Sequence, residues 1–229
     1  MEQFEEPYNL WNVGIYTVPE VARLTGMRAG KMRRWLRGHK TNGKWYPPLW
    51  TPQVQVEDEM FLGFEDLIEF KAAQAFMAEG VSAKAIRAAI VAAQNFIEDD
   101  RPLSNPRLRT DGRKVFLEIA EESGDNHFLE LVRGQYAFGR LIEKSLRDVV
   151  IEDGDPVMWW PLSKRAGILL DPQRAFGQPI EADSGVPTVV LANAAAVEGG
   201  VQEAARAWDV RPRSVQRAID FEEWYARAA

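Results

Sequence analysis

The sequence predicts a mainly helical protein with a smaller β component. Helices are indicated at 64–97 and 201–225, where apolar residues recur at helical spacing. Some sheet is indicated at 45–61, which is rich in Trp, Pro, Val and Thr and alternates in part. We divide the 229 residues into a first unit at 1–98, a connecting small α/β or β-rich region at 99–165, and a C-terminal helical unit at 166–229.

The first unit opens with strong helix signals. Thr17 and Glu20 are placed to form a capping box, and Pro19 in the first turn costs no helical hydrogen bond. Gly26 can supply the positive φ that a tight exit from a helix requires. We therefore expect one helix that ends at Gly26 and a second helix at 29–37.

These two helices have the spacing of a helix-turn-helix. In that motif a small residue lets the helices approach, a turn residue follows four positions later, and apolar residues lock the second helix ten and thirteen positions later. Ala22, Gly26, Met32 and Trp35 meet these offsets. We expect Met32 and Trp35 to be buried together with Leu36.

Positive charge collects in this stretch, although the formal net charge of the chain is -6. Eight Arg or Lys residues and no acid lie between Val21 and Pro48. A charge run alone fits a solvated basic face, but the helix-turn-helix spacing favours DNA, whose phosphates bind such side chains. The residues expected to contact DNA are Arg28, Lys31, Arg33, Arg34, Arg37, Lys40 and Lys44.

The rest of the first unit predicts a wing and two helices. Residues 45–61 fit paired strands or a wing. In the helical stretch that follows, Gly80 ends one helix and Ser82 caps the next. The expected apolar stripes are Leu67, Phe70 and Ala73 on the first helix and Ile86, Ile90 and Phe96 on the second.

The connecting region is turn-rich at first and then strand-like. We expect a hairpin about Asp111 and Gly112, with strands at 114–120, 127–132 and 146–153.

A second helix-turn-helix spacing lies near the C-terminus. Ala205, Asp209, Val215 and Ala218 repeat the offsets, and aspartate tolerates a left-handed turn. Two glutamates follow the basic side chains of this pair, so its positive field is weaker than that of the first. A dimer contact, or a secondary DNA contact, is expected from Arg211, Arg213 and Arg217, with the protein contact favoured.

Aromatic residues outside the basic stretch are expected to contact protein. The cluster at 157–162 is typical of a core or an interface, and the last helix carries two further aromatics. The residues assigned to a protein partner are Trp159, Trp160, Trp224 and Tyr225.

Residues 14–95 resemble the DNA-binding domain of MerR-type regulators. A helix-turn-helix, a wing and then "EDLIEFKAAQAFMAEGVSAKAIRAAI" carry the resemblance. Residues 31–35 occupy the place of a T-x-R-x-W motif, with Arg34 replacing the usual aromatic. The family's long dimerisation helix and effector domain do not follow, so small-molecule sensing is not implied.

The C-terminal unit resembles a small helical domain found in VapB-type antitoxins. "LLDP", "FGQPI", "GVPTVVLANAAAVEGG" and the final helix pair carry this resemblance. Many relatives have G-T-R-x-P where this chain has residues 184–187, which lack the arginine. Together the two resemblances imply an antitoxin with one part that binds DNA and another that binds protein. Such an antitoxin represses its own operon as a homodimer on double-stranded DNA and neutralises a PIN-like ribonuclease toxin.

An antitoxin is weighed against a transcription regulator without a toxin partner and against an enzyme. The enzyme has no support, because dinucleotide-binding, P-loop and G-x-S-x-G motifs are absent. With no cysteine and two histidines, we expect no catalytic residue, no metal site and no cofactor. The acidic pairs are interpreted as solvated turns: Glu121 with Glu122, and Asp153 with Asp155. An acidic N-terminus and the lack of a membrane-length apolar run favour the cytoplasm.

Overall fold

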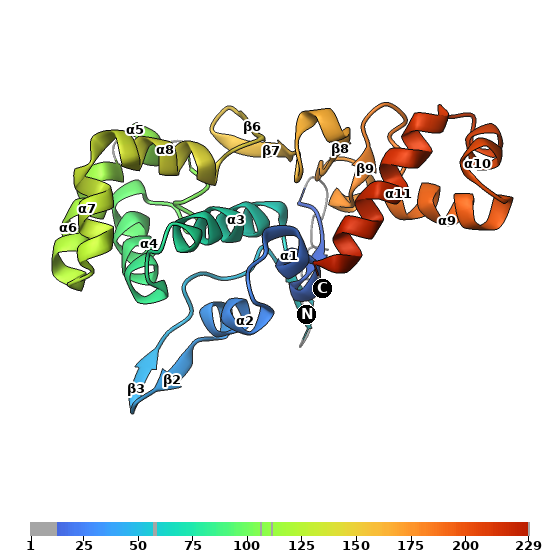
Figure 1. Ribbon diagram of the computed structural model, residues 1–229. Helices are drawn as coiled ribbons and strands as arrows, with labels where there is room; N and C mark the ends of the chain where they lie inside the picture. The colour runs from blue at the N-terminus through green and yellow to red at the C-terminus, as the bar shows by residue number, and fades with distance from the viewer. Residues whose placement is uncertain (1–12, 57–58, 106, 111, 229) are drawn as a thin grey trace, which may run out of the picture.

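The structure is a computed structural model that describes residues 13–56, 59–105, 107–110 and 112–228. Helices predominate and the strands form small antiparallel sheets, which confirms the predicted mainly helical fold with a smaller β component. The molecule is elongated, with α6 (Gly112–Ser123) and α7 (Asn126–Arg133) at one end and α9 (Thr188–Glu198) and α10 (Val201–Ala207) at the other (Figure 1). No helix in the described ranges is long and apolar enough to cross a membrane.

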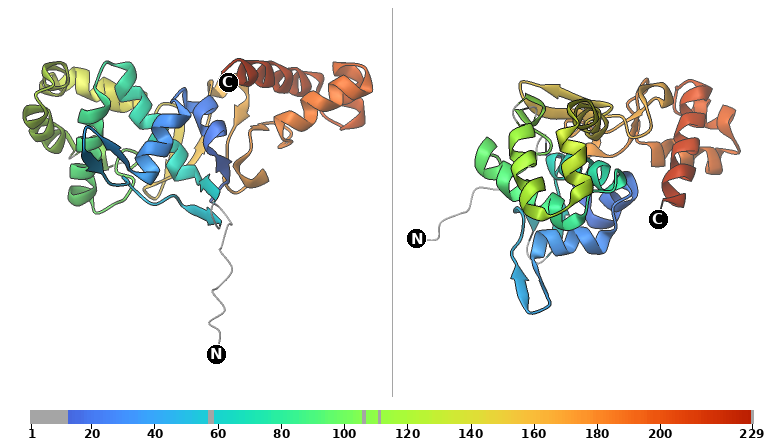
Figure 2. Two further views of the ribbon diagram at one scale, coloured as in Figure 1. Left: turned by 90° about the horizontal axis from the view of Figure 1, so that it is seen from below. Right: turned by 60° about the vertical axis from the view of Figure 1, so that its left-hand side comes forward.

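Residues 13–97 form two helix pairs beside a small sheet. They contribute β1 (Tyr16–Thr17), α1 (Val18–Thr25), α2 (Ala29–Arg37), β2 (His39–Thr41), β3 (Lys44–Tyr46), β4 (Val54–Val56), β5 (Glu59–Leu62), α3 (Phe64–Ala78) and α4 (Ala83–Ile97). Strand β5 lies between β1 and β4, while β2 and β3 form a separate hairpin. This hairpin extends away from the helices (Figure 2). Paired strands thus occur within 45–61 as predicted, but the hairpin already begins at His39.

The predicted signals at the start of the chain are confirmed. The backbone nitrogen and the hydroxyl of Thr17 each donate over 2.7 Å to Glu20 Oε2, and the Glu20 N–H donates back to the Thr17 hydroxyl. Gly26 has a φ of 74° and closes α1 with a hydrogen bond to the carbonyl of Ala22. Helix α2 has the expected bounds, and its buried residues are Met32, Trp35 and Leu36.

The two longer helices follow the predicted signals with one exception. Gly80 has a φ of 90° after α3, and the Ser82 hydroxyl caps α4. Phe96 is exposed, so the prediction that it continues the apolar stripe of α4 is wrong. Ile97 is buried in its place, because it lies two helical turns after Ile90 and so faces the core. The other predicted stripe residues are buried: Leu67, Phe70, Ala73, Ile86 and Ile90.

The connecting region is largely helical, and the strands predicted at 114–120 and 127–132 are wrong. It contributes α5 (Arg107–Thr110), α6, α7, α8 (Gln135–Ser145), β6 (Val149–Glu152) and β7 (Asp155–Trp159). Phe116 lies at ring-centroid distances of 6.0 Å from Phe128 and 5.4 Å from Phe138, so these apolar runs are the inner faces of three helices. Gly112 begins α6 rather than a hairpin, and Asp111 lies outside the described residues.

The strand expected at 146–153 is present in part, as β6, which pairs with β7. Asp153 has a positive φ in the turn between the two strands, and both Asp153 and Asp155 are exposed. These two carboxylates therefore lie in a solvated turn, as interpreted from the sequence. Glu121 and Glu122 are exposed as well, but they lie within helix α6, so the interpretation of that pair as a turn is wrong.

The C-terminal unit is a helical trio that follows short strands. Its elements are η1 (Lys164–Ala166), β8 (Ile168–Leu169), η2 (Ala175–Gly177), β9 (Ile180–Glu181), α9, α10 and α11 (Pro212–Arg227). Asp209 has a φ of 51°, as predicted for the turn between α10 and α11, and Val210 N donates to Ala205 O over 3.0 Å. Val215 and Ala218 are buried against the neighbouring helices.

The two ends of the chain share one apolar core. Buried residues from Tyr16 to Phe221 form a continuous cluster that crosses positions 98 and 165. The Tyr16 hydroxyl, itself buried, donates over 2.8 Å to the carbonyl of Gly177, and Ile15 N donates over 3.0 Å to Phe176 O. The segment that leads into α1 is therefore held by a later part of the chain.

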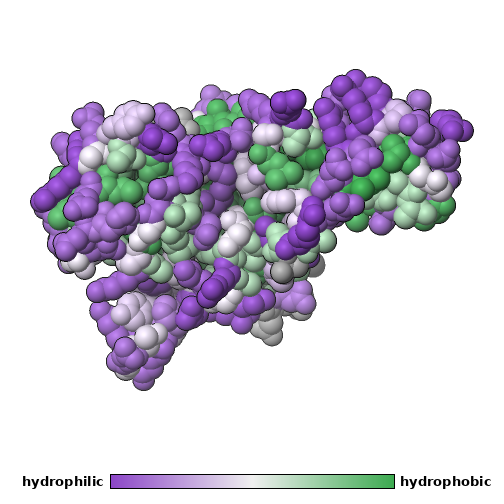
Figure 3. Space-filling model, in the orientation of Figure 1, coloured by the Kyte–Doolittle hydropathy of each residue, from purple (hydrophilic) through white to green (hydrophobic). Residues whose placement is uncertain are grey.

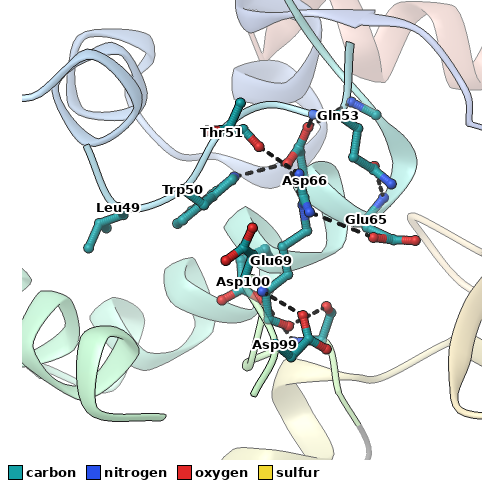
Figure 4. Close-up of polar contacts among 12 residues, drawn as sticks. Leu49, Trp50, Thr51, Gln53, Glu65, Asp66, Glu69, Asp99 and Asp100 are labelled. Atoms are coloured by element: carbon teal, nitrogen blue, oxygen red, sulfur yellow. Dashed lines mark hydrogen bonds and ion pairs between the residues drawn. The ribbon is translucent and has the colours of Figure 1, made fainter. Parts of the chain in front are cut away.

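Two buried carboxylates of α3 fix the segments on either side of this helix (Figure 4). Asp66 is fully buried and accepts from Trp50 Nε1 over 2.9 Å and from Arg101 Nε over 2.6 Å. Glu69 is also fully buried, and its two oxygens accept the backbone N–H groups of 103 and 104. Burial raises the pKa of Glu69 to about 8, and these two hydrogen bonds oppose that shift.

Candidate nucleic-acid interface

Helix α2 is amphipathic, with an apolar buried face and a basic exposed face. The buried face carries Met32, Trp35 and Leu36. The exposed side chains around it are Arg28, Arg33, Arg34 and Arg37. Arg28 is the N-cap residue and gives no side-chain cap, so the first N–H groups of α2 and its dipole are open to an anion.

The basic side chains predicted to contact DNA form one uncompensated surface. Six of them are exposed, and Lys31 is partly buried with its Nζ 3.0 Å from Met77 Sδ. That burial lowers the pKa of Lys31, and the nearby Arg28 and Arg34 lower it further. None of the seven forms an ion pair with another residue that the structure describes: Arg28, Lys31, Arg33, Arg34, Arg37, Lys40 and Lys44.

The hairpin β2–β3 continues this surface and has two different faces. On one face His39 stacks on Tyr46 at 5.1 Å between ring centroids. On the other face Lys40 is paired with Trp45, which is 58% exposed. A Cβ at Gly38 would lie 2.7 Å from the Trp45 ring, so glycine is needed for the ring to rest there. The outer face of the hairpin therefore offers a cation beside an aromatic ring.

A cleft of about 250 Å³ lies between α2, the hairpin and the start of α4. Lys31 and Arg34 line it from α2, and Lys84 and Arg87 line it from α4. The guanidinium of Arg87 lies 5.8 Å from the centre of the Tyr46 ring and donates to the carbonyl of Pro47. Four cations around one cleft suit a phosphate group.

Sequence reasoning missed Lys84 and Arg87. They lie three residues apart near the start of α4, a spacing that puts two side chains on neighbouring positions of a helix surface; Lys84 is exposed and Arg87 is partly buried. Nothing local to α4 indicated that this surface faces α2, because the contact joins residues about fifty positions apart.

The C-terminal arginines are in a different electrostatic state. Arg211, Arg213 and Arg217 all contact a single oxygen, Asp183 Oδ2, and Arg217 also contacts the buried Glu181. Their charges are thus partly compensated within the chain, in contrast to those on α2.

The aromatic residues expected at a partner surface are mostly packed. Trp159 is 3% exposed and bonds to Leu170 through both backbone groups, so its side chain belongs to the core and, contrary to expectation, is not available to a partner. Trp160 is half-buried. Trp224 and Tyr225 are partly buried against the main core, where Tyr225 stacks on Phe221 and the Trp224 ring is tilted against it.

Metal chemistry has no donor set in the part of the chain that the structure describes. There, no three His, Cys, Asp or Glu side chains are grouped so that they could hold a metal ion.

The chain is similar to a curated protein and to a solved structure. No protein-family model matches the chain. The chain is 25% identical over 233 residues to "Putative antitoxin VapB45" of Mycobacterium tuberculosis (strain ATCC 25618 / H37Rv), covering 92% of this chain and 94% of that protein. Its fold is similar to the X-ray crystal structure of Rv2018 from Mycobacterium tuberculosis, with a TM-score of 0.69, 23% identity, and coverage of 92% of this chain and 99% of the other. The first similarity supports the resemblance to VapB-type antitoxins over nearly the whole chain.

Proposed function

We propose that this chain is the antitoxin of a type II toxin-antitoxin pair, which binds its own operator and neutralises a PIN-like ribonuclease toxin. The observation that carries DNA binding is the uncompensated basic surface of α2 and the hairpin, defined by the seven residues above. The description of the mycobacterial relative as an antitoxin supports the toxin partner.

The N-terminal helices act in this proposal as a MerR-like winged helix-turn-helix. Helix α2 is the recognition helix, and its open N-terminus with Arg28 holds a phosphate. Arg33 and Arg34, both exposed on α2, read guanine edges in the major groove. The cleft formed with Lys84 and Arg87 holds a second phosphate. A homodimer would double these contacts on a palindromic operator.

The toxin is assigned to the end of the molecule away from this surface. Hydrophobic residues gather there over the C-terminal helices (Figure 3). Val197 is 82% exposed and Trp208 is half exposed, and neither is needed for the core of the helical trio. Exposed apolar side chains of this kind are typical of protein interfaces.

A transcription regulator without a toxin partner remains the second candidate, because the same basic surface would serve it. The two are separated by producing the chain together with the product of the adjacent gene. An antitoxin retains that product through purification and restores growth when the product is toxic. In an antitoxin, Arg33→Gln with Arg34→Gln weakens operator binding strongly without abolishing rescue. A neighbour that neither binds nor harms growth would favour the plain regulator.

A further inference from the structure

Three guanidinium groups converge on one carboxylate oxygen at the start of α11. Asp183 Oδ2 lies 2.5 Å from Arg211, 2.8 Å from Arg213 and 2.9 Å from Arg217, measured to the nearest guanidinium nitrogen. The hydrogen bond from Arg213 is the main reason why the pKa of Asp183 is lowered. Arg217 has a second partner, Glu181 Oε1 at 2.9 Å.

The positive charge of this cluster is only partly neutralised. Three arginines face two carboxylates, and Arg217 stays paired with the buried Glu181 if Asp183 leaves. Arg211 and Arg213 have Asp183 as their one ionic partner within the described chain. Their side chains are more than half exposed, and ion pairs at such positions contribute little to stability, so the contact can open without unfolding the helices.

The position of these arginines matches that of the basic residues on α2. Arg211 is the N-cap residue of α11 with φ and ψ of -71° and 142°, and Arg28 is the N-cap residue of α2 with -64° and 125°. Neither helix has a side-chain cap, and each follows a shorter helix across a left-handed turn residue, Asp209 or Gly26. The local architecture is shared, and what differs is that an acidic residue of the chain occupies the second site.

We propose that the start of α11 is a second site for the phosphates of duplex DNA, and that Asp183 occupies it as an internal mask. When the carboxylate of Asp183 is removed or displaced, Arg211 and Arg213 bind the DNA backbone. DNA is favoured over an acidic protein as the ligand because the arrangement repeats that of α2. There the uncapped helix N-terminus and the arginine at the N-cap position suit a phosphate. This site goes beyond the proposed operator interface and is separate from it.

The test measures binding of the full-length chain to a 30-base-pair duplex of random sequence as the salt concentration varies. Arg33→Gln with Arg34→Gln forms the background, so that the contribution of α2 is reduced. On it, Asp183→Asn should tighten binding and steepen the log-log salt slope by about one to two units, since each phosphate contact adds about 0.9. Adding Arg211→Gln and Arg213→Gln should remove the gain.

Glu223→Gln is the matched control, because it changes the net charge by the same amount as Asp183→Asn. Glu223 is exposed on α11 and has no ion pair among the described residues. Equal effects of Asp183→Asn and Glu223→Gln on DNA affinity and salt slope would overturn the proposal. It would also be overturned if Asp183→Asn bound polyglutamate more tightly and left DNA binding unchanged.

A second measurement does not depend on whether Asp183→Asn folds. In the otherwise unchanged chain, Arg211→Gln with Arg213→Gln should leave the salt slope unaltered, because both side chains are masked. A flatter slope would show that they already contact DNA and would overturn the mask. Neither result decides the role of α2. That role is tested separately by the loss of DNA affinity in Arg33→Gln with Arg34→Gln.

Discussion

The guanidinium of Arg23 lies 4.4 Å from the centre of the Tyr225 ring, so α1 and α11 are in direct contact. Tyr225 is half-buried in this position and stacks at 5.8 Å on Phe221, which belongs to the main core. The orientation of α1, and of α2 behind it, therefore depends on a residue near the C-terminus.

Tyr225→Ala should lower the free energy of unfolding by about 2 kcal/mol, because it removes a partly buried ring and a cation-π contact. Tyr225→Phe keeps the ring and should lose much less. Thermal unfolding followed by circular dichroism measures both. Tyr136→Ala, which removes an exposed tyrosine from α8, is the control and should stay close to the parent. Equal losses for Tyr225→Ala and Tyr225→Phe would mean that the ring is not the stabilising group.

Trp35→Ala should destabilise the chain by roughly 3–5 kcal/mol, as expected for deletion of a buried indole. Trp35 is 3% exposed and lies 6.3 Å from the Phe70 ring, so its loss leaves a cavity between α2 and α3. Trp45→Ala removes the same side chain from the outer face of the hairpin and should change stability by less than about 1 kcal/mol. Denaturant titration of both variants makes the comparison, and a Trp35→Ala protein as stable as Trp45→Ala would contradict the packing described for α2.

The free energy of unfolding should fall as the pH rises from 4.5 to about 8 because of Glu69. Its pKa is about 8 in the folded chain against 4.5 for the free side chain, so the folded state holds more protons in this window. The contribution of Glu69 is complete below pH 4.5 and is lost as the pH approaches 8, at no more than about 1.4 kcal/mol per unit.

Glu69→Gln should flatten this dependence, which urea titrations at pH 5, 6, 7 and 8 can measure. The window ends at pH 8 because burial also lowers the pKa of Lys71 to about 8, and that group acts in the opposite direction at higher pH. Parallel pH profiles for the parent and Glu69→Gln would show that Glu69 does not titrate in this range.

The parts of the fold that could be predicted from the sequence are those whose signals are local. The capping box at Thr17, the turn at Gly26 and the left-handed Asp209 each depend on neighbours within a few residues, and the structure has all three. The sequence predicts strands at Phe116 and Phe128 because short apolar runs fit a strand as well as a helix face, and only the packing partners of these rings distinguish the two structures.

The candidate site could be predicted in outline but not in its charge balance. The basic residues of α2 lie close together in the sequence, so their clustering was visible there. The pairing of Arg213 with Asp183 spans 30 positions, and the joint cleft of Arg34 with Arg87 spans more than 50. Such contacts depend on the tertiary fold, which the spacing of charges along a chain does not reveal.

The most direct test of the account compares two double variants in which the same number of charges is removed. Operator binding is measured by gel shift over a range of salt concentrations for Arg33→Gln with Arg34→Gln and for Arg211→Gln with Arg213→Gln. We expect the first pair to weaken binding strongly and to lower the salt slope by up to about 1.8 units, since each phosphate contact contributes about 0.9. The second pair should leave both quantities unchanged. Full binding by the first variant and loss by the second would contradict the assignment of DNA recognition to α2.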